Sequence, residues 1–278
     1  MLSGVLMVTI AAASWGTWSL FLRPTGLPST VTSPLIFLVM ALATFPLALR
    51  EKRAVWDRRA VGLLLANTVF DALNLITFFA AMEYTTVAIA VITHYLAPIL
   101  IALAAPRVEG TKTPGAPLAA LIALAGLGIM LEPWRGGGSG VLIGAALGAT
   151  SAVCYMGNVF VTRRLAQQVG PAHAMSYHSA LAGVLLLPFA VSGFATVSWF
   201  DLGLLSAGAA TIGGMSGVVF IRGLTRIGAA RSAVLTFAEP LVAVAVGALV
   251  WDEPLRPLAA AGGALVLAAG IHVARQAR

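Results

Sequence analysis

Long apolar runs alternate with short polar connections along almost the whole chain. Dividing the sequence at proline, glycine and charge clusters leaves ten runs. Each is close to the roughly 20 residues that a helix needs to cross a hydrocarbon layer of about 30 Å. The pattern therefore predicts an all-α integral membrane protein with ten transmembrane helices. The expected spans cover about 3–22, 32–49, 61–82, 85–105, 115–131, 140–162, 172–192, 201–221, 232–250 and 257–274.

Composition and charge support a membrane protein. Of the 278 residues, 59% are hydrophobic and only 10% are charged, whereas soluble proteins carry roughly a quarter charged residues. The formal net charge of +7 could indicate a nucleic-acid partner, but the basic residues are sorted by connection, which is typical of membrane proteins. We therefore expect the lipid bilayer as a partner and no nucleic acid.

The sorting of Lys and Arg also predicts the orientation. In a ten-span arrangement only Arg23, Arg135 and Arg256 fall on one side of the membrane. Basic connections favour the cytoplasm, so the sequence predicts a multi-pass protein of the bacterial inner membrane with both termini cytoplasmic. The fourteen basic residues on the cytoplasmic side are Arg50, Lys52, Arg53, Arg58, Arg59, Arg107, Lys112, Arg163, Arg164, Arg222, Arg226, Arg231, Arg275 and Arg278.

An internal repeat divides the ten spans into two halves. We expect a first five-helix repeat at 1–135, a glycine-rich link at 136–140 and a second five-helix repeat at 141–278. Because five is odd, the halves must face opposite ways across the membrane. Inverted repeats are the architecture of many secondary transporters, which bind their substrates near the midplane. The matching segments are 117–131 with 257–273, 91–103 with 235–246 (Pro98 over Pro240), and GVL at 4–6 with GVL at 140–142.

Four short motifs carry a family resemblance that covers nearly the whole chain. They are HYLAP at 94–98, FAEPL at 237–241, SWGTWSLF at 14–21 and WDEPL at 251–255. On these motifs the chain resembles the drug/metabolite transporter superfamily, whose EamA-type members are ten-helix exporters built from two repeats. Within it the chain is most similar to bacterial aromatic amino-acid exporters. The resemblance implies a secondary transporter that exports amino acids, aromatic or otherwise amphipathic, and related metabolites by alternating access.

Polar residues inside the expected spans need a reason, because an Asp at the centre of a membrane helix costs about 2.5–3.5 kcal/mol on insertion scales. They recur at spacings of three or four residues, which places them on single helix faces. Such faces must look at one another or at water rather than at lipid. The third span carries Asn67, Asp71, Asn74 and Phe78, the fourth His94 and Tyr95, the sixth Thr150, Cys154, Tyr155, Asn158 and Thr162, and the ninth Ser232, Thr236 and Glu239.

Ten side chains from these spans are the candidate substrate-binding residues. A carboxylate or a tyrosine hydroxyl suits a substrate ammonium group, and tryptophan or phenylalanine suits an apolar side chain. Polar residues can instead simply join helices, prolines can simply kink them, and a carboxylic acid can act as a hydrogen-bond donor. Pro98 and Pro240 are the expected hinges. The candidates are Trp15, Trp18, Asp71, Asn74, Phe78, His94, Tyr95, Tyr155, Asn158 and Glu239.

Other functional classes find little support in the sequence. The chain contains no HExxH, no GxSxG and no nucleotide-binding P-loop, so we expect neither an enzyme nor a cofactor or metal site. No selectivity-filter-like loop indicates a channel. A sugar-phosphate transporter would need Lys or Arg in mid-span, where this chain has almost none. The alternative that stays open is an exporter or exchanger of another small metabolite or of a drug-like cation.

Overall fold

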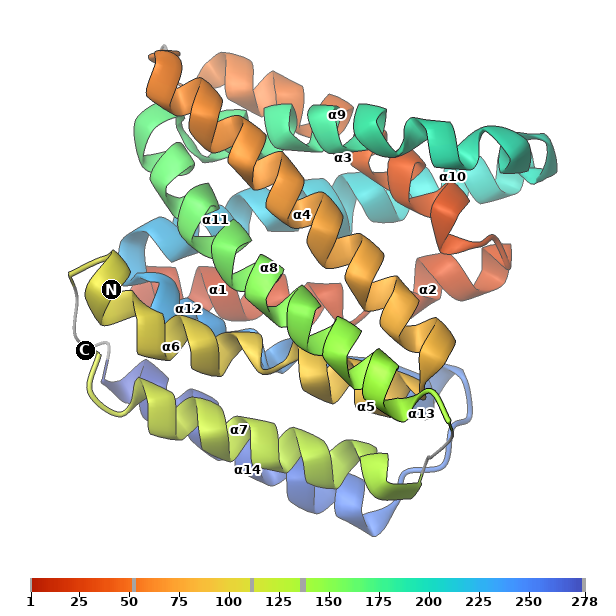
Figure 1. Ribbon diagram of the computed structural model, residues 1–278, viewed down its shortest axis with the longest axis vertical. Helices are drawn as coiled ribbons and strands as arrows, with labels where there is room; N and C mark the ends of the chain where they lie inside the picture. Colours follow the sequence, from red (N-terminus) through yellow and green to blue (C-terminus); the bar gives the residue numbers. More distant parts are fainter. Residues whose placement is uncertain (1, 52–53, 111–112, 136–138, 277–278) are drawn as a thin grey trace.

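The computed structural model describes residues 2–51, 54–110, 113–135 and 139–276. Within these ranges every regular element is helical, which confirms the predicted all-α fold (Figure 1). The first half contains α1 (Leu2–Trp15), α2 (Ser19–Leu22), α3 (Ser29–Arg50), α4 (Arg58–Tyr84), α5 (Val87–His94), α6 (Ala97–Val108) and α7 (Ala116–Leu131). The second contains α8 (Val141–Val169), α9 (Pro171–Ala190), α10 (Trp199–Gly208), the π-helix η4 (Ala209–Met215), α11 (Ser216–Ile227), α12 (Ala229–Leu235), α13 (Ala238–Val250) and α14 (Pro257–Arg275).

Ten helical spans account for these elements, and nine of them, among the described residues, are long and apolar enough to cross a membrane. The tenth is α9, whose 20 residues reach about 30 Å. His173, Ser176, His178 and Ser179 lie on it and make it less apolar than that criterion requires. Large apolar side chains such as Leu142 and Leu249 are more than four-fifths exposed, as expected of a lipid-facing surface.

Helix pairing shows the duplication of the two halves. The principal contacts are α4 with α8, α3 with α9, α7 with α14, α1 with α11, and α6 with α12. Replacing each span by the one five spans away turns the α1–α11 pair into the α8–α4 pair and leaves the other three pairs unchanged. This exchange symmetry is what two inverted five-helix repeats require. The proposed repeat boundaries remain a prediction, and residues 136–138 of the link lie outside the described residues, as do Lys52, Arg53, Lys112 and Arg278.

Three spans are broken near their middles. The first span breaks between α1 and α2, the fourth at Tyr95–Leu96, and the ninth at Thr236–Phe237. The role of Pro98 and Pro240 as hinges remains a prediction. Pro98 and Pro240 lie in the first turn of α6 and α13, where the missing N–H would have no helical partner anyway. Each break therefore precedes its proline.

Both described ends of the chain lie on the same side of the molecule (left in Figure 1). The Arg226 guanidinium donates to the Ser3 hydroxyl at 3.2 Å, and the Arg231 guanidinium donates to the Gln276 carbonyl at 3.4 Å. These two arginines flank the turn between α11 and α12. Termini on one side agree with an even number of spans.

Candidate functional site

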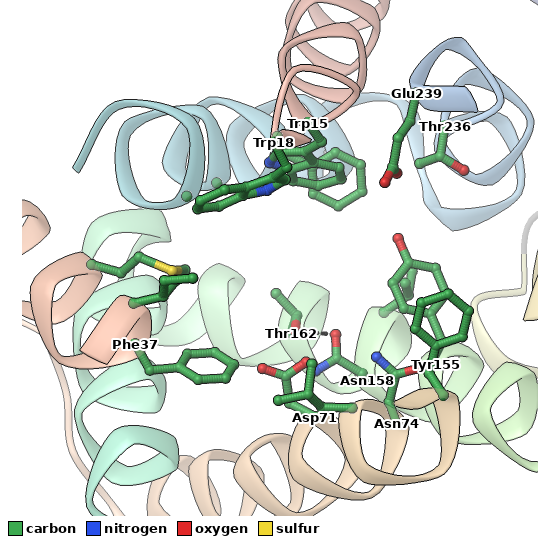
Figure 2. A pocket seen from close by; sticks show the side chains of 18 of the residues that line it. Trp15, Trp18, Phe37, Asp71, Asn74, Tyr155, Asn158, Thr162, Thr236 and Glu239 are labelled. Atoms are coloured by element: carbon green, nitrogen blue, oxygen red, sulfur yellow. Dashed lines mark hydrogen bonds between the residues drawn. The ribbon is translucent and has the colours of Figure 1, made fainter. Parts of the chain in front are cut away.

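A cavity of about 440 Å³ lies between the two halves, within the roughly 300–1,000 Å³ typical of small-molecule sites. Its walls come from the α1–α2, α3, α4 and α5–α6 segments of the first half and from α8, α9, η4–α11 and α12–α13 of the second. Figure 2 shows Trp15, Trp18, Thr236 and Glu239 on one side of the space and Asp71, Asn74, Tyr155 and Asn158 on the other. Neither α7 nor α14 supplies a lining residue.

The structure brings all ten candidate substrate-binding residues into this cavity. Pro98 lines it as well, whereas Pro240 is buried and does not. Sequence reasoning missed several lining side chains, chiefly Phe37, Met40, Met175, His178 and Phe220. The ten that it found are Trp15, Trp18, Asp71, Asn74, Phe78, His94, Tyr95, Tyr155, Asn158 and Glu239.

The polar face of α4 is held by three separate hydrogen-bonded contacts. The Thr162 hydroxyl donates to the Asn67 side-chain oxygen at 2.6 Å. One turn further along α4, Asp71 contacts a histidine of α9. A further turn on, the Ser151 hydroxyl donates to the Asn74 side-chain oxygen at 2.8 Å and lies 2.7 Å from Nδ1 of His94. Because the serine has one proton, His94 donates from Nδ1 in this chain of contacts.

The histidine that contacts Asp71 is His178, at 2.8 Å between Nε2 and Oδ2. Its ring is buried, and Nδ1 has no hydrogen-bond partner. A neutral ring with its proton on Nε2 fits this setting, because a second N–H would be buried without an acceptor. An ionisable residue inside a span is itself a signal of function, so the sequence could have revealed His178. The other histidine of this helix, His173, lies near the start of α9 and contacts Glu51.

Glu239 reaches the cavity from the opposite wall. Among the described residues it has no ion pair, and no Lys or Arg lines the cavity. Tyr95 and Tyr155 line the same cavity as its carboxyl group, and so does Asp71. The cavity thus carries two carboxyl groups, two histidines and two tyrosines, and no permanently cationic side chain.

Close packing around Gly16 positions the aromatic wall. A Cβ at this glycine would collide with the backbone oxygen of Glu239 and lie 2.7 Å from the Cβ of Val242. Only glycine therefore lets the break after α1 approach α13 so closely. Trp15, beside it, donates its indole N–H to the Ile212 carbonyl of the π-helix at 3.1 Å, and its ring lies 4.8 Å from that of Phe220.

One residue of the expected polar faces points elsewhere. Thr150 on α8 is exposed and donates to the Ala146 carbonyl of its own helix. A four-residue step turns a helix by about 400°, so three steps from Thr150 to Thr162 accumulate roughly 120° of drift. Thr162 can face the cavity only if Thr150 turns away from it.

Two duplicated, inverted halves with a cavity between them are typical of a secondary transporter. The sequence profile of the EamA-like transporter family matches residues 2–131 and again residues 142–274. The chain belongs to this family.

Sequence similarity to known proteins extends over most or nearly all of the chain. An uncharacterised transporter of Archaeoglobus fulgidus is 28% identical, with 98% of this chain and 96% of the relative aligned. The pseudopaline exporter CntI of Pseudomonas aeruginosa is 26% identical over the same shares. The uncharacterised inner membrane transporter YicL of Salmonella typhimurium is 25% identical over 86% of this chain and 84% of its own. A crystal structure with 21% identity matches the fold with a TM-score of 0.84 over 98% of both chains.

These findings confirm the EamA-type resemblance and a membrane transporter rather than an enzyme. They do not support the narrower likeness to aromatic amino-acid exporters, because the relatives are a pseudopaline exporter and transporters without an assigned substrate. The substrate of this chain must therefore be argued from its own cavity.

Proposed function

We propose that this protein exports small amphipathic metabolites that carry an ammonium group, amino acids among them, from the cytoplasm across the bacterial inner membrane. The two halves alternate access to the cavity, and the helix breaks before Pro98 and Pro240 serve as hinges. Both termini are cytoplasmic in this arrangement, in keeping with the sorting of the basic residues.

The observation that carries the proposal is the chemistry of the cavity lining. Asp71 and Glu239 supply carboxyl groups, no Lys or Arg of the described part of the chain lines the space, and the remaining walls are largely aromatic and apolar. A cation placed against a carboxylate and an aromatic face gains from both contacts. A substrate carrying only negative charge would find no cation to pair with.

A drug-like organic cation remains the second candidate, and the aromatic walls favour it. Trp15, Trp18 and Phe220 line the cavity together, and aromatic faces bind quaternary ammonium groups as well as primary ones. Such a cation differs from an amino acid in having no carboxylate. Paired substrates with and without that carboxylate therefore separate the two candidates.

Reconstituted protein in liposomes provides the test. Binding and flux are measured with a panel of amino acids and with the corresponding amines that lack the carboxyl group. Asp71→Asn is expected to weaken binding at least tenfold, because a charge-assisted contact contributes about 1.5–3 kcal/mol. Glu83→Gln is the matched control, since Glu83 is exposed near the end of the same helix. Unaltered binding by Asp71→Asn, or no flux of any amine, contradicts the proposal.

Orientation is tested by labelling introduced cysteines. Ser139 and Ser198 lie in connections that the proposal places outside the cytoplasm. Cysteine at either position should react with an impermeant reagent added to intact cells. Reaction only from the cytoplasmic side would reverse the orientation.

A further inference from the structure

We propose that the cavity is built for substrates with two cationic groups, such as diamines and amino acids with a basic side chain, with one ammonium on Asp71 and the other on Glu239. This inference rests on the proposed function and narrows its substrate class. It concerns the number of charges that the site recognises, which the family membership does not settle.

The two carboxyl groups belong to opposite walls and to opposite halves of the protein. Asp71 lies on α4 and Glu239 on α13, and Figure 2 shows them on facing sides of the same open space. Tyr155 lines the same cavity as both carboxyl groups. A ligand that fills the cavity can therefore reach both carboxyl groups at once.

Among the described residues, no Lys or Arg forms an ion pair with either carboxyl group. Asp71 accepts a hydrogen bond on Oδ2 from His178, which leaves Oδ1 for a ligand. Glu239 has no ion pair within the part of the chain that the structure describes. A charge held away from water is stabilised chiefly by a partner of opposite charge. A substrate with one ammonium group can form an ion pair with only one of these carboxylates, whereas a dication can form an ion pair with both.

The space between the two carboxyl groups suits an apolar linker. Trp15, Tyr155 and Phe220 contribute to its walls, and Trp15 is fixed by its bond to Ile212 and its contact with Phe220. Such walls favour a methylene chain over a polar one. A flexible chain with an ammonium group at each end matches this distribution of charge and apolar surface.

A series of straight-chain α,ω-diamines with three to eight carbons, each compared with the n-alkylamine of equal length, tests the inference. Binding to purified wild-type protein is measured by calorimetry at constant pH and salt. We expect affinity to peak at one chain length. At that length the diamine should bind about tenfold or more tightly than the monoamine, because a second charge-assisted contact is made.

Variants of the two carboxyl residues test whether Glu239 binds the second ammonium group of the diamine. Glu239→Gln should remove the advantage of the diamine over the monoamine, whereas Asp71→Asn should weaken the binding of both ligands. Glu83→Gln, the exposed carboxyl control on α4, should alter neither. If Asp71→Asn cannot be purified, Glu239→Gln alone tests the inference. The inference requires this variant to bind the diamine no more tightly than it binds the monoamine.

The outcomes distinguish this inference from the proposed function. Monoamines that bind as tightly as diamines, or a diamine advantage that survives Glu239→Gln, overturn the two-cation site and leave amine export standing. Absence of binding and flux for every amine overturns both. A diamine advantage that disappears in Glu239→Gln supports both.

Discussion

Arg163 offers the most direct test of how the cavity is closed. It follows the cavity-lining Thr162 on α8, and its Nη1 lies 3.1 Å from Oε1 of Glu109 at the end of α6. Its Nε donates to the Leu224 carbonyl of α11 at 3.3 Å. Glu109 in turn accepts a hydrogen bond from the Ala229 amide at the start of α12. The Arg163 guanidinium therefore contacts the ends of α6 and α11 directly and the start of α12 through Glu109. These contacts lie beside the cavity, on the side that carries most of the basic residues.

The burial of this pair sets the size of the expected effect. The Glu109 side chain is only 4% exposed, and breaking a buried ion pair costs about 3–5 kcal/mol. Glu109 keeps its bond to the Ala229 amide, so we take the lower value. About 3 kcal/mol corresponds to a change of roughly 150-fold in the ratio of closed to open protein. Arg163→Gln should increase the open population at this end of the cavity by up to that factor.

Labelling kinetics measure this population. Cys154 is replaced by Ala, a cysteine is placed at the buried, cavity-lining Ile221, and its reaction with an impermeant maleimide is followed from the Arg163 side in membrane vesicles. Arg164→Gln is the control, because Arg164 is exposed and bonds the Val108 carbonyl at 2.9 Å. Equal labelling rates in Arg163→Gln and Arg164→Gln, with both proteins folded, would refute the reasoning.

Three further changes have defined outcomes. Gly16→Ala should lower thermal stability in detergent by about 1–3 kcal/mol through overpacking against α13, whereas Gly62→Ala, with nothing within 4 Å of its Cβ, should raise it. Trp15→Phe should cost about 1 kcal/mol of stability, because the π-helix carbonyl loses its donor. Asp57 accepts bonds from the Ala60 amide and from a glutamine of α8, and these hold its pKa below the ordinary value. Asp57→Ala should therefore lower the melting temperature near neutral pH, with the difference lost as pH falls through that lowered pKa.

Helical periodicity made much of the site predictable. Asn67, Asp71 and Asn74 are spaced by four and three residues, so they share one face of α4 wherever that helix lies. A polar face in a membrane helix must turn away from lipid, so it must meet other polar faces or water. The same reasoning placed Glu239 and His94 inside. Burial cost and helix geometry together predicted much of the polar part of the cavity, although His178 was missed.

The apolar walls and the specific partners were not predictable in this way. Phe37 and Phe220 line the cavity, yet lipid and an aromatic cavity accept the same side chains, so an apolar span does not reveal which face looks inward. The contact between Asp71 and His178 depends on how α4 crosses α9, which neither helix encodes alone. The π-helix at 209–215 likewise follows from tertiary packing, in which Ile212 accepts the Trp15 indole N–H.

The duplication relates Arg163–Glu109 to a second ion pair at the opposite end of the cavity. Arg23 lies near the end of the first span and Arg163 in the last third of the sixth, and Glu253 follows the ninth span as Glu109 follows the fourth. Arg23 and Glu253 are 2.6 Å apart, but both side chains are about half exposed, so their pair contributes only about 0–1 kcal/mol. The two ion pairs therefore differ in strength because their side chains differ in burial. If the two halves exchange conformations as proposed, the Arg23–Glu253 pair should become buried when the Arg163–Glu109 pair becomes exposed, and labelling at both ends of the cavity would test this.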